Sequence, residues 1–372
     1  MDSGLSNRMK LSLKDLLPKL SETTPPKLYN PATAIDLSLA QNEVIRGELL
    51  EYFKTTIEDN FTQELTLMKT FASPATEGED IQHRKALASF FNSYFNPIHT
   101  VLPEHVVVTA GASDAVESLI HAVCNDGDSV IVPGPYWYGY ETLLKSRANV
   151  NIIVAHPPTY HNHDNYLLPS LQAAFNFAAE RSRIKAVILC NPHNPLAQCY
   201  PKRALIECME FCQEQGLHFI CDEIFALTAL SGLPTTTTPF ISALSLTEPL
   251  VPEGAVKIDP SRVHVVWSAS KLFGASGLRV VSQDSLQRWD VKFVQPTHGI
   301  FLFAKLAQNA KTAEEEKQFF DKLALQGVRV DAGRFYKGVE LEYGWARIRF
   351  SVSKEVMTSA VTTIGTFLDK NS

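Results

Sequence analysis

Short apolar runs alternate with amphipathic stretches through the middle of the chain. The runs are dense in Val and Ile and show little polar alternation, which is typical of strands buried on both faces of a parallel sheet. We predict strands over residues 106–109, 129–132, 151–155, 185–190, 218–221 and 263–267. Helical periodicity between them predicts helices over residues 113–124, 139–146, 169–181 and 202–215. This alternation predicts an α/β fold with a large, doubly wound, mostly parallel sheet.

The C-terminal part of the chain has a different pattern, which predicts a smaller α+β domain. Strands are expected over residues 299–304 and 345–351, and helices over residues 313–325 and 354–368. The N-terminal segment up to about Tyr52 is expected to pack with this domain. The predicted units are an N-terminal arm with part of the small domain at 1–55, a large domain at 56–285 and a C-terminal small domain at 286–372.

Composition and charge narrow the function classes. A formal net charge of −6, without any run of basic residues, gives no reason to expect a nucleic-acid partner. No apolar stretch approaches the length of a membrane span, and the N-terminus lacks the apolar centre of a signal peptide. We therefore expect a cytoplasmic protein. In that compartment its six cysteines are expected to be buried apolar side chains rather than disulfides.

Candidate chemistry lies directly after the predicted strands, where ligands of doubly wound sheets bind. Ala110-Gly111-Ala112-Ser113 opens a predicted helix, and the free N–H groups of a helix start favour a phosphate. Alone, this motif is more often a tight turn before a core helix. Asn191-Pro192-His193-Asn194-Pro195 follows the predicted strand that ends at Cys190, and its Asn-Pro pairs fix an extended backbone from which Asn194 can point an amide at a ligand.

Two further motifs carry ionisable groups. Asp222 ends a buried strand and needs a partner, because an unpaired buried charge is costly; the partner is either a protonated pyridine nitrogen or a structural arginine. Ser268-Ala269-Ser270-Lys271 follows the last strand, and Gly274, Gly277 and Arg279 come after it. A lysine among hydroxyls and small residues suits a Schiff base if its amine is desolvated, whereas a solvated surface lysine is the plain alternative.

These motifs together match what pyridoxal-phosphate catalysis requires: an imine lysine, an acid on the ring nitrogen and a phosphate cradle. The chain resembles class I/II aminotransferases of the pyridoxal-phosphate fold type I. Within them it is most similar to the fungal branch related to 1-aminocyclopropane-1-carboxylate synthase. The resemblance runs from about Leu5 to the C-terminus and rests on the motifs IDLSLAQN at 35–42, NPHNPLA at 191–197, SASKLFGASGLR at 268–279 and WARIRF at 345–350.

The resemblance implies a role for each matching residue. Lys271 would carry the cofactor and then move the α-proton, Asp222 would pair with the pyridine nitrogen, and Asn194 would hydrogen-bond the ring oxygen. Trp137 would stack on the ring and Arg347 would bind the substrate α-carboxylate; a core aromatic and a surface salt bridge are the alternatives. The phosphate would be held by the backbone of Ala112 and Ser113 and the side chains of Ser268, Ser270 and Arg279. A homodimer is also implied.

The chain departs from the family pattern in several places. Phe225 stands where a tyrosine usually reaches the ring oxygen, Ala197 replaces a glycine, Gln41 replaces a glutamate, and near Phe71 the chain lacks the tyrosine whose hydroxyl commonly reaches the neighbouring subunit's phosphate. The largest departure follows Arg279. The family continues there with a strand and long helices, whereas residues 280–295 are all that separates this arginine from the small-domain segment. Several dozen residues are missing.

Several functions remain open. The leading hypothesis is an aminotransferase acting on an amino acid or an amino-acid-derived intermediate of fungal secondary metabolism. The alternatives are a lyase that cleaves C–S bonds by β- or γ-elimination, and a shortened relative without activity. A nicotinamide dehydrogenase is disfavoured because the chain has no G-x-G-x-x-G turn. His161-Asn162-His163-Asp164 is interpreted as solvated surface in a loop, so no metal site is expected.

Overall fold

The computed structural model describes residues 9–10, 13–14, 17–18, 29–44, 46–60, 81–246, 258–272 and 289–371. Its larger lobe contains five parallel strands in the order β3-β2-β4-β5-β6. The strands are β2 (Ser129–Pro133), β3 (Asn151–Ala155), β4 (Ile184–Cys190), β5 (His218–Asp222) and β6 (Val263–Val266). They agree with the predicted strands to within one or two residues, and they form the predicted parallel sheet.

Helices cover both faces of this sheet, because successive residues of each strand point to opposite sides. Val130, Ala186 and Ile220 pack with α5 (Ala112–Val123) and α6 (Gly139–Ser146) in one cluster. The alternate strand residues pack with α7 (Leu167–Asn176) and α8 (Lys202–Glu214) in another. In α8, Leu205, Cys208 and Cys212 are buried at helical spacing on the face toward the sheet. The sheet is therefore doubly wound, as predicted.

Two sequence predictions in this lobe are wrong. Residues 106–109 form no strand, and Val107 and Val108 are 83% and 40% exposed. Within the described residues the sheet ends at β6, so this segment has no neighbour to accept its backbone hydrogen bonds. The helix expected over 169–181 starts earlier and ends at Asn176, because a short 3-10 turn at Arg181–Arg183 leads the chain into β4.

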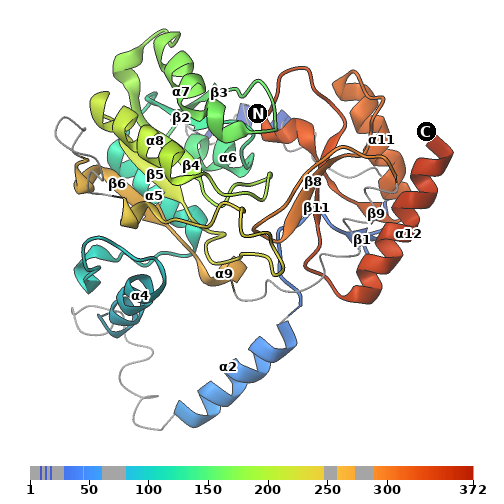
Figure 1. Ribbon diagram of the computed structural model, residues 1–372, viewed down its shortest axis with the longest axis horizontal. Helices are drawn as coiled ribbons and strands as arrows, with labels where there is room; N and C mark the ends of the chain where they lie inside the picture. The colour runs from blue at the N-terminus through green and yellow to red at the C-terminus, as the bar shows by residue number, and fades with distance from the viewer. Residues whose placement is uncertain are drawn as a thin grey trace.

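The smaller lobe contains a four-stranded antiparallel sheet in the order β10-β11-β8-β7. Its strands are β7 (Phe293–Val294), β8 (Phe301–Lys305), β10 (Asp331–Ala332) and β11 (Trp345–Arg349), and its helices are α11 (Ala313–Leu325) and α12 (Lys354–Asn371). The two lobes lie side by side (Figure 1). The N-terminal segment joins the smaller lobe, because β1 (Ile35–Asp36) pairs in parallel with β9 (Val328–Arg329).

The remaining helices are less integrated. α4 (Ile81–Tyr94) lies below the large lobe, and α2 (Arg46–Asn60) projects away from the body (Figure 1). The domain boundaries predicted near residues 55 and 285 stay a prediction. Among the described residues, no helix combines the length and the apolar character that crossing a membrane requires.

Candidate active site

The predicted site residues converge at the carboxyl edge of the large sheet. Asp222 is the last residue of β5, and it lies in register with Cys190 at the end of β4 and Val266 at the end of β6. Asn194 follows β4, and Lys271 belongs to the short helix α9 (Ala269–Leu272) that follows β6. Parallel strands place their carboxyl ends at one edge, so side chains distant in the sequence meet there.

Asp222 has a partner that sequence reasoning did not identify. Its side chain is 6% exposed, and one carboxylate oxygen accepts a hydrogen bond from the hydroxyl of Tyr140. The other oxygen accepts the backbone N–H of Ile224 at 3.2 Å. Burial raises the pKa of Asp222, while the Tyr140 hydroxyl, the Ile224 N–H and the nearby charge of Lys271 lower it. In the described part of the chain no arginine forms an ion pair with this acid.

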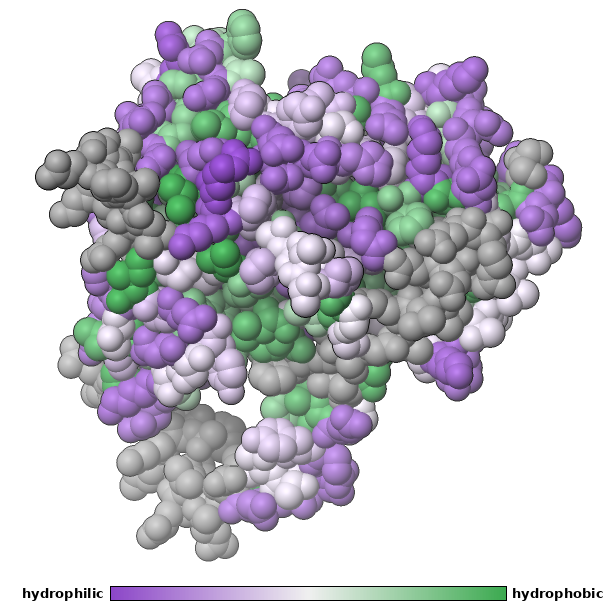
Figure 2. Space-filling model, in the orientation of Figure 1, coloured by the Kyte–Doolittle hydropathy of each residue, from purple (hydrophilic) through white to green (hydrophobic). Residues whose placement is uncertain are grey.

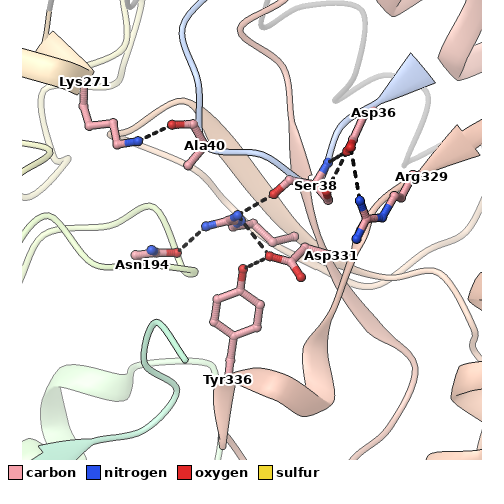
Figure 3. Close-up of polar contacts among 9 residues, drawn as sticks. Asp36, Ser38, Ala40, Asn194, Lys271, Arg329, Asp331 and Tyr336 are labelled. Carbon is pink, nitrogen blue, oxygen red and sulfur yellow. Dashed lines mark hydrogen bonds and ion pairs between the residues drawn. The ribbon is translucent and has the colours of Figure 1, made fainter. Parts of the chain in front are cut away.

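Lys271 occupies the environment that a Schiff-base lysine needs. Its side chain is half-buried, and its Nζ donates a hydrogen bond to the carbonyl of Ala40 (Figure 3). Burial lowers the pKa of this amine, the charge of Arg347 lowers it further, and Asp222 opposes the shift. The alternative of a solvated surface lysine is therefore wrong.

Arg347 reaches the same place from the other lobe. It is 4% exposed and donates hydrogen bonds to Asn194 Oδ1 at 3.2 Å, the Ser38 carbonyl at 2.6 Å and Asp331 Oδ2 at 3.0 Å (Figure 3). Its Nε is buried and has no hydrogen-bond partner. The ion pair with Asp331 is buried, so the surface salt bridge considered for this arginine is wrong. A buried donor without an acceptor is costly, which marks the Nε as a position for an incoming acceptor.

Aromatic rings line this end of the site. The guanidinium of Arg347 lies 5.1 Å from the ring centroid of Phe301 and 5.5 Å from that of Tyr336. Trp137 is half-buried, and its ring meets that of Tyr140 edge-on at 5.5 Å. Gly139 leaves the space for this indole, because a Cβ at that position would overlap the ring. The stacking role of Trp137 stays a prediction.

The expected phosphate end is more open. α5 begins at Ala112, after Gly111 in a left-handed conformation with φ of 96°, and no side chain caps the helix start. Ser113 is exposed, and the hydroxyls of Ser268 and Ser270 lie 2.8 Å apart in contact with solvent. No hydrogen bond between described residues joins these serines to the start of α5. Arg279 lies outside the described residues.

The departures from the family pattern have local consequences. Phe225 is 2% exposed and packs edge-on against Phe301, with ring centroids 5.1 Å apart, so it supports a ring under Arg347. Ala197 has a φ of 56°, a left-handed conformation that glycine adopts more easily, which explains the usual glycine there. Gln41 is exposed, and its carbonyl accepts the Ser351 hydroxyl at 2.6 Å. Phe71 lies outside the described residues.

One interpretation of the histidine loop needs correction. His163 is 6% exposed, and its ring packs against those of Tyr200 and His193. Burial lowers its pKa to about 4, so this side chain is part of a core and not of the solvated surface. Within the described residues, no group of three or more His, Cys, Asp or Glu side chains could hold a metal. Four cysteines are buried and Cys124 and Cys190 are half-buried; all are free.

The side chains present fit pyridoxal phosphate. A buried carboxylate, an amine with a lowered pKa and an arginine with an orphaned donor meet at one sheet edge. The first suits a protonated ring nitrogen, the second an aldehyde and the third the carboxylate of an amino acid. Sequence reasoning missed Tyr140 and Asp331. Tyr140 carried a signal, since it lies one helical turn after Trp137 in the same aromatic run, whereas Asp331 carried none.

Comparisons with known proteins agree with this geometry. The family model for aminotransferase class I and II matches residues 37–283. "Probable aminotransferase aclI" from Aspergillus oryzae is 28% identical over 430 positions that cover 99% of each chain. "Probable aminotransferase sirI" from Leptosphaeria maculans is 30% identical over 427 positions that cover 98% of each. 1-Aminocyclopropane-1-carboxylate synthase 1 of rice is 32% identical over 263 residues, 68% of this chain and 51% of that protein.

Solved structures show the same fold. The aromatic aminotransferase of Pyrococcus horikoshii has a TM-score of 0.70 at 17% identity, covering 96% of this chain and 99% of that one. The aspartate aminotransferase of Thermotoga maritima has a TM-score of 0.67 at 18% identity, covering 98% and 100%. The alignment with aclI has 430 positions against 372 residues here, so that relative contains internal stretches that this chain lacks.

Proposed function

Because this chain belongs to the class I and II aminotransferases, a family of pyridoxal-phosphate-dependent enzymes, we propose that it transfers the amino group of an amino acid or an amino-acid-derived intermediate. We place that substrate in fungal secondary metabolism, on the strength of the similarity to fungal aminotransferases over nearly the whole chain. One observation carries the proposal: Lys271, Asp222 and Arg347 come from separate elements and meet in space. Lys271 lies close enough to Arg347 and Asp222 for their charges to shift the pKa of its amine.

When bound, pyridoxal phosphate supplies an aldehyde that accepts an amine and a protonated ring that draws electrons from the substrate α-carbon. Lys271 is the residue that carries it. Desolvation and the charge of Arg347 favour the neutral amine, which is the form that attacks an aldehyde. With the cofactor and a substrate bound, the Nζ of Lys271 would be the base that moves the α-proton.

Asp222 and Asn194 hold the ring. The carboxylate of Asp222 would keep the ring nitrogen protonated, and the hydroxyl of Tyr140 fixes the position of that carboxylate. The amide N–H of Asn194 would donate to the ring oxygen, while its Oδ1 accepts from Arg347. The phosphate is assigned to the backbone of Ala112 and Ser113 and to Ser268, Ser270 and Arg279, and the stacking face to Trp137.

Arg347 binds the α-carboxylate of the substrate. Its Nη2 already donates to Ser38 and Asp331 and its Nη1 to Asn194, so the orphaned Nε–H and the one remaining hydrogen of Nη1 are the donors available to a ligand. Charge-assisted hydrogen bonds of this kind fix both the position and the orientation of a carboxylate.

We also propose that the enzyme works as a homodimer. α2 carries large apolar side chains that solvent reaches: Leu50 is 63% exposed, Phe53 50% and Ile57 57%. Hydrophobic residues also interrupt the polar surface near the middle of the face drawn in Figure 2. Exposed apolar groups of this extent favour association. Phe53→Asp should lower the dimer fraction at least about tenfold in sedimentation velocity, while Lys54→Asp, one residue along the helix, should change it little.

The function is tested by absorption spectroscopy of the purified protein with added pyridoxal phosphate. A near-visible band that borohydride fixes, with peptide mapping placing the reduced cofactor on Lys271, is the expected result. Amino acids are then screened with keto-acid, ammonia and sulfide detection. Keto acid formed only with an acceptor supports transamination, whereas ammonia or sulfide release means elimination. A folded protein that binds no cofactor would overturn the proposal.

A further inference from the structure

Three arginines of the smaller lobe lie around the site, and each has a carboxylate partner. Arg347 pairs with Asp331 at 3.0 Å, and Arg329 with Asp36 at 3.3 Å. Arg349 pairs with Glu43 at 3.0 Å. Figure 3 shows the first two pairs next to each other, linked through Ser38, whose carbonyl accepts from Arg347 and whose backbone N–H and hydroxyl both donate to Asp36. The charges of these pairs cancel, so the cations bring no net positive charge to the site.

Of the three carboxylates, Asp331 is the one that contacts Arg347. It is 7% exposed, lies on β10, and accepts hydrogen bonds from Arg347 Nη2 and, at 2.6 Å, from the hydroxyl of Tyr336. Burial raises the pKa of Asp331, while the charge of Arg347 and the hydroxyl of Tyr336 lower it and favour the ionised carboxylate. Nη2 of Arg347 therefore already donates to a carboxylate of the protein and is not free to bind a substrate carboxylate.

Aromatic side chains surround the same arginine. The rings of Phe301 and Tyr336 flank its guanidinium. Tyr138 is half-buried and packs against Tyr336 and Phe335, with ring centroids 5.8 Å and 5.9 Å apart. Its hydroxyl lies close enough to Asp331 for that charge to raise its pKa, after the larger effect of burial. Apolar walls of this kind pack against a neutral side chain and give a second carboxylate nothing to replace its hydration.

On the premise that Arg347 binds the α-carboxylate, we propose that the substrate side chain carries no negative charge, and that Asp331 enforces this selection by neutralising Arg347. An amino acid with an uncharged side chain adds one carboxylate and one ammonium, which leaves the site balanced. A dicarboxylate such as aspartate, glutamate or a 2-oxo diacid adds a further negative charge near Asp331. In a buried site that charge needs its own cation, and the arginines are already paired.

The test uses the full chain loaded with pyridoxal phosphate and two ligands that both have five-carbon main chains, 4-methylpentanoate and glutarate, which end in a branched alkyl group or in a second carboxylate. Dissociation constants are measured by calorimetry, so the readout does not depend on turnover. We expect 4-methylpentanoate to bind at least about tenfold more tightly than glutarate. In Asp331→Asn we expect glutarate binding to improve by about tenfold and the preference to be largely lost. Asp321→Asn removes a charge from the ion pair with Lys317 on α11, which involves none of the three arginines, and should keep the preference.

The outcomes separate this inference from the proposed function. Glutarate binding as tight as 4-methylpentanoate in the unmodified protein would overturn the inference alone, and would point to Arg349, whose Nε is also buried without a partner. Failure of both ligands to bind a protein whose cofactor is attached to Lys271 would overturn the carboxylate role of Arg347 as well. If Asp331→Asn does not fold, the ratio in the unmodified protein still decides.

Discussion

The two ends of the candidate site are built differently. At the ring and carboxylate end, Asp222, Arg347 and Asp331 are buried: Asp222 accepts from Tyr140, and Arg347 donates to Asp331 and to Asn194 of the other lobe. At the phosphate end, Ser113 and Ser270 are exposed and the start of α5 has no side-chain cap. The first end is organised before any ligand binds, whereas the second presents donors to solvent. A buried charge is costly unless it is paired in the folded protein. The N–H groups of an exposed phosphate-binding turn can instead bond to water until an anion binds.

The largest loss of activity is expected from removing Lys271, the reactive amine at the ring and carboxylate end. Lys271→Ala should abolish turnover and the covalent attachment of the cofactor, because among the described residues Lys271 is the amine whose pKa the charges of Arg347 and Asp222 shift. The phosphate end is left intact, so the variant should still bind the cofactor without a bond that borohydride fixes. Mass spectrometry after reduction checks this, and turnover persisting in the variant would contradict the assignment of Lys271.

Removing the ring acid should be the next largest change. Asp222→Ala should retain bound cofactor and lose on the order of a thousandfold in kcat, because the ring nitrogen would no longer be kept protonated. Asp222→Asn, of the same shape, should be impaired to a similar extent, which separates the charge from the packing. Rates close to those of the unmodified enzyme would mean that another group serves the ring nitrogen.

A substitution of Tyr140 tests whether its hydroxyl sets the pKa of Asp222. Its hydroxyl lowers the pKa of Asp222, so Tyr140→Phe should raise that pKa and protonate the acid at a higher pH. As pH falls, activity should therefore be lost earlier, and the acidic limb of the kcat/KM profile should move to higher pH. A loss of about tenfold at the optimum is expected. Tyr136→Phe, whose hydroxyl donates to Glu141 instead, is the matched control and should leave the acidic limb in place.

The smallest effect is expected at the phosphate end. Ser270→Ala should weaken cofactor binding by about fivefold, because an exposed hydroxyl exchanges a ligand hydrogen bond for one to water. At saturating cofactor kcat should be unchanged. Equilibrium dialysis measures the affinity, with Ser261→Ala on a distant exposed turn as the control. A loss as large as that of the ring-end variants would show that the phosphate end is organised too.

Local pattern predicted most of the scaffold. β3, α6 and α11 have the predicted bounds, because their apolar periodicity and their flanking turns are properties of the segment itself. Residues 106–109 were mispredicted as a strand for the opposite reason. A run of valines has the propensity for a strand, but the strand forms only where a neighbour accepts its hydrogen bonds.

By itself, the sequence determined the parallel sheet, the order of its helices and the edge at which Asn194, Asp222 and Lys271 would lie, since strand order and helix crossovers follow from local periodicity. Only the tertiary structure decided what each of these groups touches. The Tyr140 hydroxyl on Asp222, the Ala40 carbonyl on Lys271 and Asp331 on Arg347 are contacts between residues 82, 231 and 16 positions apart. Such contacts depend on how helices, strands and the N-terminal segment pack together, and buried polar groups need partners, which makes the contacts specific.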